Sequence, residues 1–213
     1  MAAVTLGWDD GTTADRRLVA RLNDAGVRAT FFLNSGKLGL SAAQSGWKDY
    51  VGAEEVASLY AGHEVGSHTI DHPDLTALPD SAIAEQVAGD RAALEDLVGY
   101  PVRGFASPFR AQDSRVEAVL ARTGIRYSRG PGTDRLGTPP PQPLRWVPAA
   151  HCLDNVTGIL SRPRPGAVYC IWGHSYEYDE HDAWHRLDEL LRAVTESGCW
   201  VATHAEVIDR LTR

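Results

Sequence analysis

Short apolar runs alternate with helical patterns along the chain. The runs cover residues 4–6, 27–34, 63–65, 102–106, 126–128, 167–172 and 200–203, and they predict β-strands. Between them, apolar residues recur at helical spacing, which predicts helices over residues 18–25, 54–61, 81–98, 114–122, 183–197 and 205–211. This alternation indicates right-handed crossovers and a mainly parallel sheet, either open and doubly wound or closed into a barrel.

One segment departs from this alternation. Residues 132–148 contain five prolines, so we expect a surface loop inside one domain rather than an ordinary short connection. With 213 residues and 43% apolar side chains, the chain has the size of a single globular domain. A domain of this size folds without a disulfide or a metal staple, so any bound metal is expected to be functional.

Charge and cysteine content exclude several classes of protein. Lysine and arginine number 21 against 28 acidic residues, so the net charge is −7, and neither nucleic acid nor an anionic membrane is an expected partner. The sequence contains no apolar run of about 18 residues and nothing that resembles a signal peptide, so we expect a cytoplasmic protein, either a monomer or a small homo-oligomer. The three scattered cysteines are typical of reduced structural thiols.

Two adjacent carboxylates, Asp9 and Asp10, directly follow the first predicted strand. In a barrel or a parallel sheet, the carboxyl ends of the strands carry the active site. One aspartate can bind a cation while the other acts as a base on water. The alternative is a polar turn in which Asp10 or Thr12 caps the next helix.

A pair of histidines, His68 and His72, has the i, i+4 spacing that brings two imidazoles onto one ion from a single helical turn. Such a pair also arises by chance in a chain with eight histidines. Together with an upstream aspartate, it makes a set of three ligands that leaves coordination positions open, which is typical of a catalytic ion.

A further polar cluster leaves the predicted strand that ends at Trp172. Its histidine, His174, is a candidate general acid or base at neutral pH, or a structural histidine. Aromatic residues at several predicted strand ends and loops could stack on sugars or fill the core. They are Trp8, Phe109, Trp172, Tyr176, Tyr178 and Trp184.

The order of these motifs resembles a known family. The Asp9–Asp10 pair, the histidine run over residues 62–75, the segment 105–109 and His174 occur in the order seen in polysaccharide deacetylases. Over nearly its whole length the chain resembles the NodB homology domain of carbohydrate esterase family 4. The resemblance implies an α/β fold, a distorted (β/α)7 barrel, with a single polysaccharide deacetylase-like catalytic domain over residues 1–213. It also implies a divalent ion, most often zinc.

The resemblance implies a role for each motif. The metal ligands would be Asp10, His68 and His72. Asp9 would be the base that takes a proton from water, and His174 would be the acid that protonates the leaving amine.

Other residues are expected at the substrate. The backbone N–H of Phe109, after Pro108, would help to hold the oxyanion. Trp172 would add an apolar wall against the acetyl methyl or the sugar, and Tyr176 and Arg110 are further candidates for substrate binding.

Two departures from the family pattern concern the groups around the base and the acid. The family often has an arginine where Ala106 stands and a glycine where Arg110 stands, so we expect Arg110 to replace the missing arginine by reaching Asp9. The residue that supports the acid has no clear match in the sequence. The candidates are Trp146, Asp154 and Glu177.

The sequence therefore predicts a metal-dependent hydrolase that removes an N-acetyl or O-acetyl group from a carbohydrate or a sugar-containing small molecule. Two alternatives stay open. One is hydrolysis of another non-peptide C–N bond, in a small-molecule amide such as a cyclic imide or ureide. The other is a catalytically silent module that binds sugar or metal on the same fold.

Overall fold

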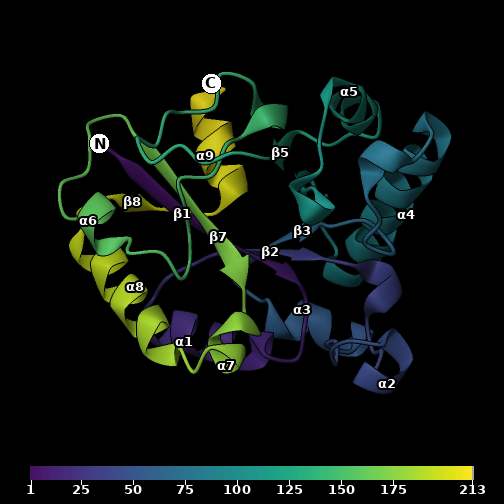
Figure 1. The fold of residues 1–213 in the computed structure, drawn as a ribbon, viewed down its shortest axis with the longest axis horizontal. Helices are drawn as coiled ribbons and strands as arrows, with labels where there is room; N and C mark the ends of the chain where they lie inside the picture. Colours follow the sequence, from purple (N-terminus) through teal and green to yellow (C-terminus); the bar gives the residue numbers. More distant parts are fainter. Residues whose placement is uncertain (213) are drawn as a thin grey trace.

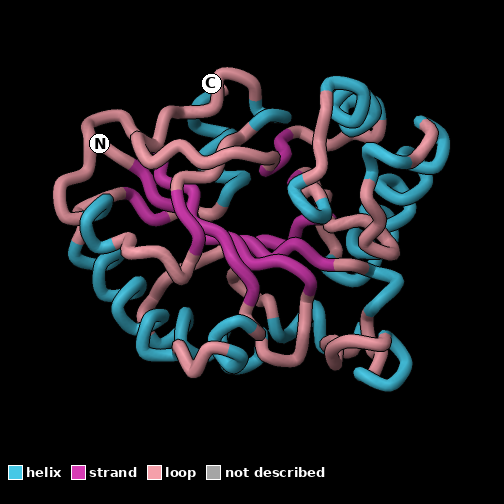
Figure 2. The backbone as a smooth tube through the Cα atoms, in the orientation of Figure 1, coloured by secondary structure: helices cyan, strands magenta, loops and turns pink. Residues whose placement is uncertain are grey.

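The computed structural model describes residues 1–212, and in this range eight β-strands form one sheet with helices packed around it (Figures 1 and 2). The strands are β1 Ala3–Asp10, β2 Thr30–Leu33, β3 Glu64–Ser67, β4 Gly104–Ala106, β5 Tyr127–Arg129, β6 Ala150–His151, β7 Val168–His174 and β8 Trp200–Val201. The helices are α1 Asp15–Asp24, α2 Ala42–Ser45, α3 Val56–Leu59, α4 Asp80–Val98, α5 Ser114–Arg122, α6 Thr157–Leu160, α7 Glu177–Glu180, α8 Trp184–Glu196 and α9 His204–Leu211.

The strands are parallel and follow the order β5-β4-β3-β2-β1-β7-β6. β8 pairs with the first residues of β1, whereas β2 pairs with the second half of β1. The all-parallel order requires a crossover after each strand, and helices on the outside of the sheet provide most of these crossovers. As a result, the carboxyl ends of the strands meet at one end of the sheet.

The chain between β5 and β6, the two outer strands of this order, closes the curled sheet. Trp146 donates its backbone N–H to the carbonyl oxygen of Ser128 in β5 (2.9 Å) and accepts from Gly130 (3.0 Å). A few residues later, β6 pairs with β7. Residues 146–151 therefore connect β5 to β7 and complete the distorted barrel that the resemblance implies.

The helix boundaries follow local sequence signals. The side chain of Asp113 caps α5 by accepting from the N–H of Val116, and Thr203 and Glu206 form a capping box at the start of α9. α8 buries one face, with Leu187, Leu190, Leu191 and Val194, and exposes the other.

The seven predicted strands are all present, and the predicted helices over 81–98, 114–122, 183–197 and 205–211 agree with α4, α5, α8 and α9 within one residue. The sequence did not predict β6, because two residues carry no detectable alternation. The proline-containing segment lies between β5 and β6, and Trp146 near its end is buried. No helix within residues 1–212 is both long enough and apolar enough to cross a membrane.

Candidate active site

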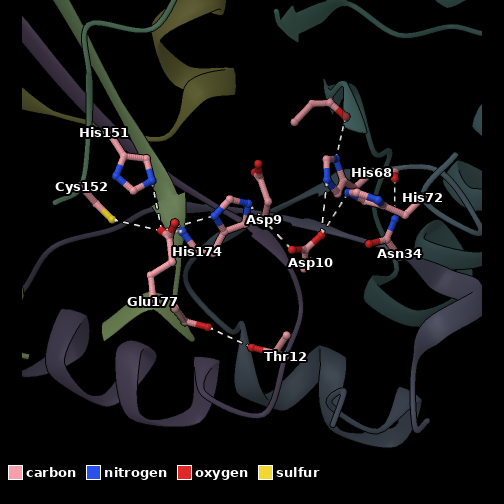
Figure 3. Close-up of polar contacts among 12 residues, drawn as sticks. Asp9, Asp10, Thr12, Asn34, His68, His72, His151, Cys152, His174 and Glu177 are labelled. Carbon is pink, nitrogen blue, oxygen red and sulfur yellow. Dashed lines mark hydrogen bonds and ion pairs between the residues drawn. The ribbon is translucent and has the colours of Figure 1, made fainter. Parts of the chain in front are cut away.

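Asp10, His68 and His72 converge at the carboxyl ends of β1 and β3 (Figure 3). The Nε2 atoms of both histidines lie 3.5 Å from Oδ1 of Asp10. Tetrahedral ligands about 2.0–2.1 Å from a zinc ion would lie about 3.3–3.5 Å from one another. The spacing of these three side chains therefore suits a small divalent cation.

The two histidines do not share a helical turn, so that part of the sequence interpretation is wrong. They lie in the loop after β3, where Thr69 and His72 adopt left-handed backbone conformations with φ of 71° and 62°. These turns of the backbone, rather than helical periodicity, bring both imidazoles to Asp10.

Two buried polar side chains hold this loop in place. Asp90 of α4 accepts from the hydroxyl of Ser67 (2.6 Å) and from the N–H of His68 (3.1 Å). Asn34, after β2, donates to the carbonyl oxygens of His68 and Thr69. The ligand loop is thus anchored to the neighbouring strand and helix, which preorganises the two imidazoles.

The protonation of these groups also suits a cation. Burial lowers the pKa of His68 and of His72 to about 4, so both rings are neutral at pH 7. Nδ1 of His68 donates to the carbonyl oxygen of Ala106 (2.7 Å), and Nε2 is therefore left with its lone pair. The carboxylate of Asp10 is buried and faces these two neutral imidazoles, so a divalent cation between the three side chains would compensate its charge.

Asp9 is paired with Arg129, not with Arg110, so the expectation that Arg110 reaches Asp9 is wrong. Nη2 of Arg129, the last residue of β5, donates to Oδ2 of Asp9, and both side chains are almost fully buried. Burial by itself raises the pKa of Asp9, but the charge and hydrogen bond of Arg129, together with His68 and His174, outweigh burial, and the pKa is lowered. Asp9 is therefore held in the ionised form that a base needs.

His174, at the end of β7, lies beside the carboxylate of Glu177 (Figure 3). Its Nδ1 lies 3.3 Å from Oε2 of Glu177, and the same oxygen accepts from the backbone N–H of His174 (2.9 Å). His151 of β6 contacts this oxygen from the other side, with Nε2 at 3.0 Å. Of the three sequence candidates for support of His174, the structure thus places Glu177 in contact with the ring.

The charges around His174 favour its protonated form. Burial lowers its pKa, but Glu177, Asp9 and Asp10 together outweigh burial, and the pKa is raised. Its other nitrogen, Nε2, lies 3.8 Å from Oδ2 of Asp10, so this edge of the ring faces the three candidate metal ligands.

These groups open into one cavity of about 520 Å³. Its lining residues combine the candidate catalytic groups with aromatic and cationic side chains; they are Asp9, Asp10, Lys37, Trp47, His68, His72, Ser107, Phe109, Arg110, Trp172, His174 and Tyr176. Every residue predicted for the site from the sequence lines this cavity except Pro108, which is buried. Of the aromatic residues singled out in the sequence, three line the cavity. The other three, Trp8, Tyr178 and Trp184, are core residues.

Unusual backbone conformations concentrate at the cavity. Within residues 1–212, six non-glycine residues have positive φ, and four of these line it: Asp10, His72, Phe109 and Arg110. Such conformations cost roughly 1–2 kcal/mol per residue and gather at functional sites. The strain places Phe109, 69% exposed, against the ring of His72 at 4.6 Å between centroids.

Sequence reasoning missed several residues of the site. Arg129 and His151 stand at the ends of β5 and β6, so the rule that strand ends carry the site could have found Arg129, whose strand was predicted. Lys37 ends the short 3-10 helix Ser35–Lys37 and Trp47 lies in the loop after α2, and the sequence carries no comparable signal for either residue.

Comparison with known proteins identifies the family. The family model for polysaccharide deacetylase matches residues 2–128, more than half of the chain. A chitooligosaccharide deacetylase of Azorhizobium caulinodans is 27% identical over 179 residues, covering 80% of this chain and 73% of that protein. A chitin deacetylase of Pestalotiopsis sp is 35% identical over 120 residues, covering 56% of this chain and 38% of that protein.

The solved structures agree in fold. A family 4 acetyl xylan esterase from Clostridium thermocellum, determined with a cobalt ion, superposes with a TM-score of 0.69 at 18% identity, covering 98% of this chain and 91% of that chain. The chain spans from about a quarter to about three quarters of the length of the first curated relatives it matches. The family match, with the fold that it requires, shows that this chain belongs to the polysaccharide deacetylase family.

Proposed function

We propose that the protein is a metal-dependent deacetylase that hydrolyses the N-acetyl group of an acetylated sugar. The observation that carries this proposal is the arrangement of Asp9, Asp10 and His174 around one cavity, together with the two histidines at Asp10. The family match and the deacetylases among the relatives support the same reaction.

Asp10, His68 and His72 are the residues that would hold the ion, and zinc suits their one oxygen and two nitrogen donors. A divalent ion in this position supplies a Lewis acid that lowers the pKa of water and polarises the acetyl carbonyl. The hydrogen bond from His68 to Ala106 and the anchoring by Asp90 and Asn34 keep the imidazoles oriented before the ion binds.

Asp9 accepts the proton of the attacking water. Arg129 keeps its carboxylate ionised, and its hydrogen bond to Oδ2 fixes the orientation of the carboxylate. The backbone N–H of Phe109 is the donor proposed for the oxyanion that forms on the acetyl oxygen.

His174 then donates a proton to the leaving nitrogen, which departs as an amine. Glu177 contacts the backbone and the ring of this histidine, so it fixes the ring and favours its protonated form. Trp172 and Tyr176 would contact the acetyl group or the sugar ring, since both line the cavity beside His174.

Acetate release from N-acetylated and O-acetylated sugars, from one to six units long, tests the proposal in the presence of zinc or cobalt. We expect release from N-acetylated sugars, and Asp9→Asn should lower turnover by about 10²–10⁴-fold, the usual value of a general base, while the ion stays bound. No acetate from any sugar, with the ion still bound, would favour another amide substrate or a silent binding module. Loss of the ion in Asp9→Asn would show that the two aspartates have exchanged roles.

A further inference from the structure

Arg110 occupies a backbone conformation that favours glycine. Its φ is 58°, and the preceding Phe109 has a φ of 55°, so two consecutive residues with side chains are left-handed. The turn is stabilised by hydrogen bonds from Arg110 N to Ser107 O (3.0 Å) and from Ala111 N to Pro108 O (2.9 Å). Glycine would adopt the same φ without the steric cost that arginine carries there. The backbone therefore does not account for an arginine at this position.

The guanidinium of Arg110 is fixed at the cavity but lacks a charged partner. Its Nη2 donates to the carbonyl oxygen of Gly132 (2.6 Å), and its carbon lies 5.3 Å from the centre of the Trp172 ring. Its Nε is buried and has no hydrogen-bond partner among residues 1–212. No carboxylate of the described chain forms an ion pair with this guanidinium. Most of its five N–H donors are thus available to a ligand.

The other charges of the cavity do not neutralise Arg110. The two acidic residues that line it are Asp9 and Asp10; the first is paired with Arg129 and the second faces the histidines. Lys37 also lines the cavity, and it too has no ion pair within the described part of the chain. This local surplus of cations lies in a protein whose net charge is −7.

A guanidinium placed over an aromatic ring, with unused N–H groups, is suited to carboxylate or phosphate oxygens, which it can bind in a bidentate manner. We propose that Arg110 binds an anionic substituent of the substrate, with Lys37 adding to the attraction. The substrate class is then an N-acetylated sugar that carries a carboxylate or a phosphate. This inference rests on the proposed deacetylase function and specifies its substrate.

Three sugars test the inference and separate the two sources of the anion. They are N-acetylglucosamine as the neutral reference, N-acetylmuramic acid as the carboxylate and N-acetylglucosamine 6-phosphate as the phosphate, each assayed for kcat/KM of acetate release. We expect the wild type to prefer one of the two anionic sugars over the neutral one at least tenfold. Raising the salt concentration should reduce this preference.

Variants of Arg110 then assign the preference to this residue. Arg110→Gln and Arg110→Gly should each lower the ratio of anionic to neutral kcat/KM by about 10–100-fold, the usual value of a charged hydrogen bond. Arg110→Gly also relieves the strained φ, so a drop of the ratio in a variant with an undiminished melting temperature excludes misfolding as the cause. Arg126→Gln is the matched control, because Arg126 is exposed and lies outside the cavity, and it should leave the ratio unchanged.

Two results would overturn the inference: a wild type that shows no preference for either anionic sugar, or Arg110 variants that lose activity equally on all three sugars. The second result would mean that Arg110 only supports Trp172. If no sugar releases acetate, the proposed function fails, and binding of the same sugars to Asp9→Asn by calorimetry still decides the inference. Tighter binding of an anionic sugar that depends on Arg110 supports it, and equal binding refutes it.

Discussion

Arg129, the last residue of β5, donates a hydrogen bond to the carboxylate of Asp9 near the end of β1, 120 residues earlier in the chain. The side chains are 1% and 4% exposed. The guanidinium also lies over the ring of Trp172, with its carbon 4.7 Å from the ring centre. The buried guanidinium of Arg129 thus fixes the proposed base and also packs against Trp172, which lines the cavity.

Replacing Arg129 should impair the base. In Arg129→Lys, a point charge replaces the planar guanidinium, and we expect kcat to fall about 10–1000-fold because Asp9 loses its orientation and part of its charge compensation. Arg129 lowers the pKa of Asp9, so the acid limb of the pH profile of kcat/KM should move to higher pH. Arg110→Ala should leave this limb in place, because Arg110 donates to Gly132 and not to Asp9. An unmoved limb in Arg129→Lys would contradict the pairing.

The structure offers two groups of possible metal ligands, and metal analysis of variants distinguishes them. One group is Asp10, His68 and His72, and the other is His151, His174 and Glu177. We expect one zinc ion per chain. Loss of a residue that only hydrogen-bonds to a metal ligand lowers metal affinity roughly 10–100-fold, and His72→Ala, which removes a ligand itself, should lower the zinc affinity by more than that.

His151→Ala should keep the full zinc content, as should His185→Ala, whose histidine is exposed. Elemental analysis after dialysis and competition with a chelator give the stoichiometry and the affinity. Retention of zinc in His72→Ala with loss in His151→Ala would assign the ion to the second group.

Glu177→Gln should weaken the proposed acid without removing it. Glu177 raises the pKa of His174, so the amide variant lowers this pKa. Because the acid acts in its protonated form, activity is lost as pH rises above its pKa, and the basic limb of the kcat profile should move to lower pH. We expect a decrease of kcat of about 10–100-fold at pH 8. His151 contacts Glu177 but is not itself the acid, so His151→Gln should have a smaller effect.

Asp15, the first residue of α1, should make stability depend on pH. It is fully buried, Tyr60 donates to its Oδ2 (2.6 Å), and burial raises its pKa from 3.8 to about 7. A raised pKa means that the folded state favours the protonated acid. Its stabilising contribution is therefore complete below about pH 4 and is lost as pH rises through about 7.

Asp15→Asn removes this titration. Relative to the wild type, its free energy of unfolding should improve by about 2–3 kcal/mol between pH 5 and pH 8, at about 1.4 kcal/mol per pKa unit. Urea unfolding at both pH values, with chelator present so that metal binding does not contribute, measures this difference. A constant difference between variant and wild type would show that Asp15 titrates near its ordinary pKa.

The sequence by itself determined the elements and most of the residues at the site. Apolar periodicity reveals strands and helices because it reflects which face each element buries, and α5 appears at its predicted bounds, 114–122. The carboxyl ends of parallel strands meet, so the positions of Asp9, Asp10 and His174 after predicted strands suffice to place them together. Their order along the chain then indicated the family.

Only the tertiary structure decided which side chains pair. Arg129 rather than Arg110 reaches Asp9 because β5 curls around the barrel toward β1, and residues 146–151 fix that curvature by bridging β5 and β7. Glu177 supports His174 because the chain turns directly after β7 and returns the carboxylate to the strand end. The pairing of Arg129 with Asp9 depends on the distance through space between strands that are 120 residues apart in sequence, and local periodicity carries no information about that distance.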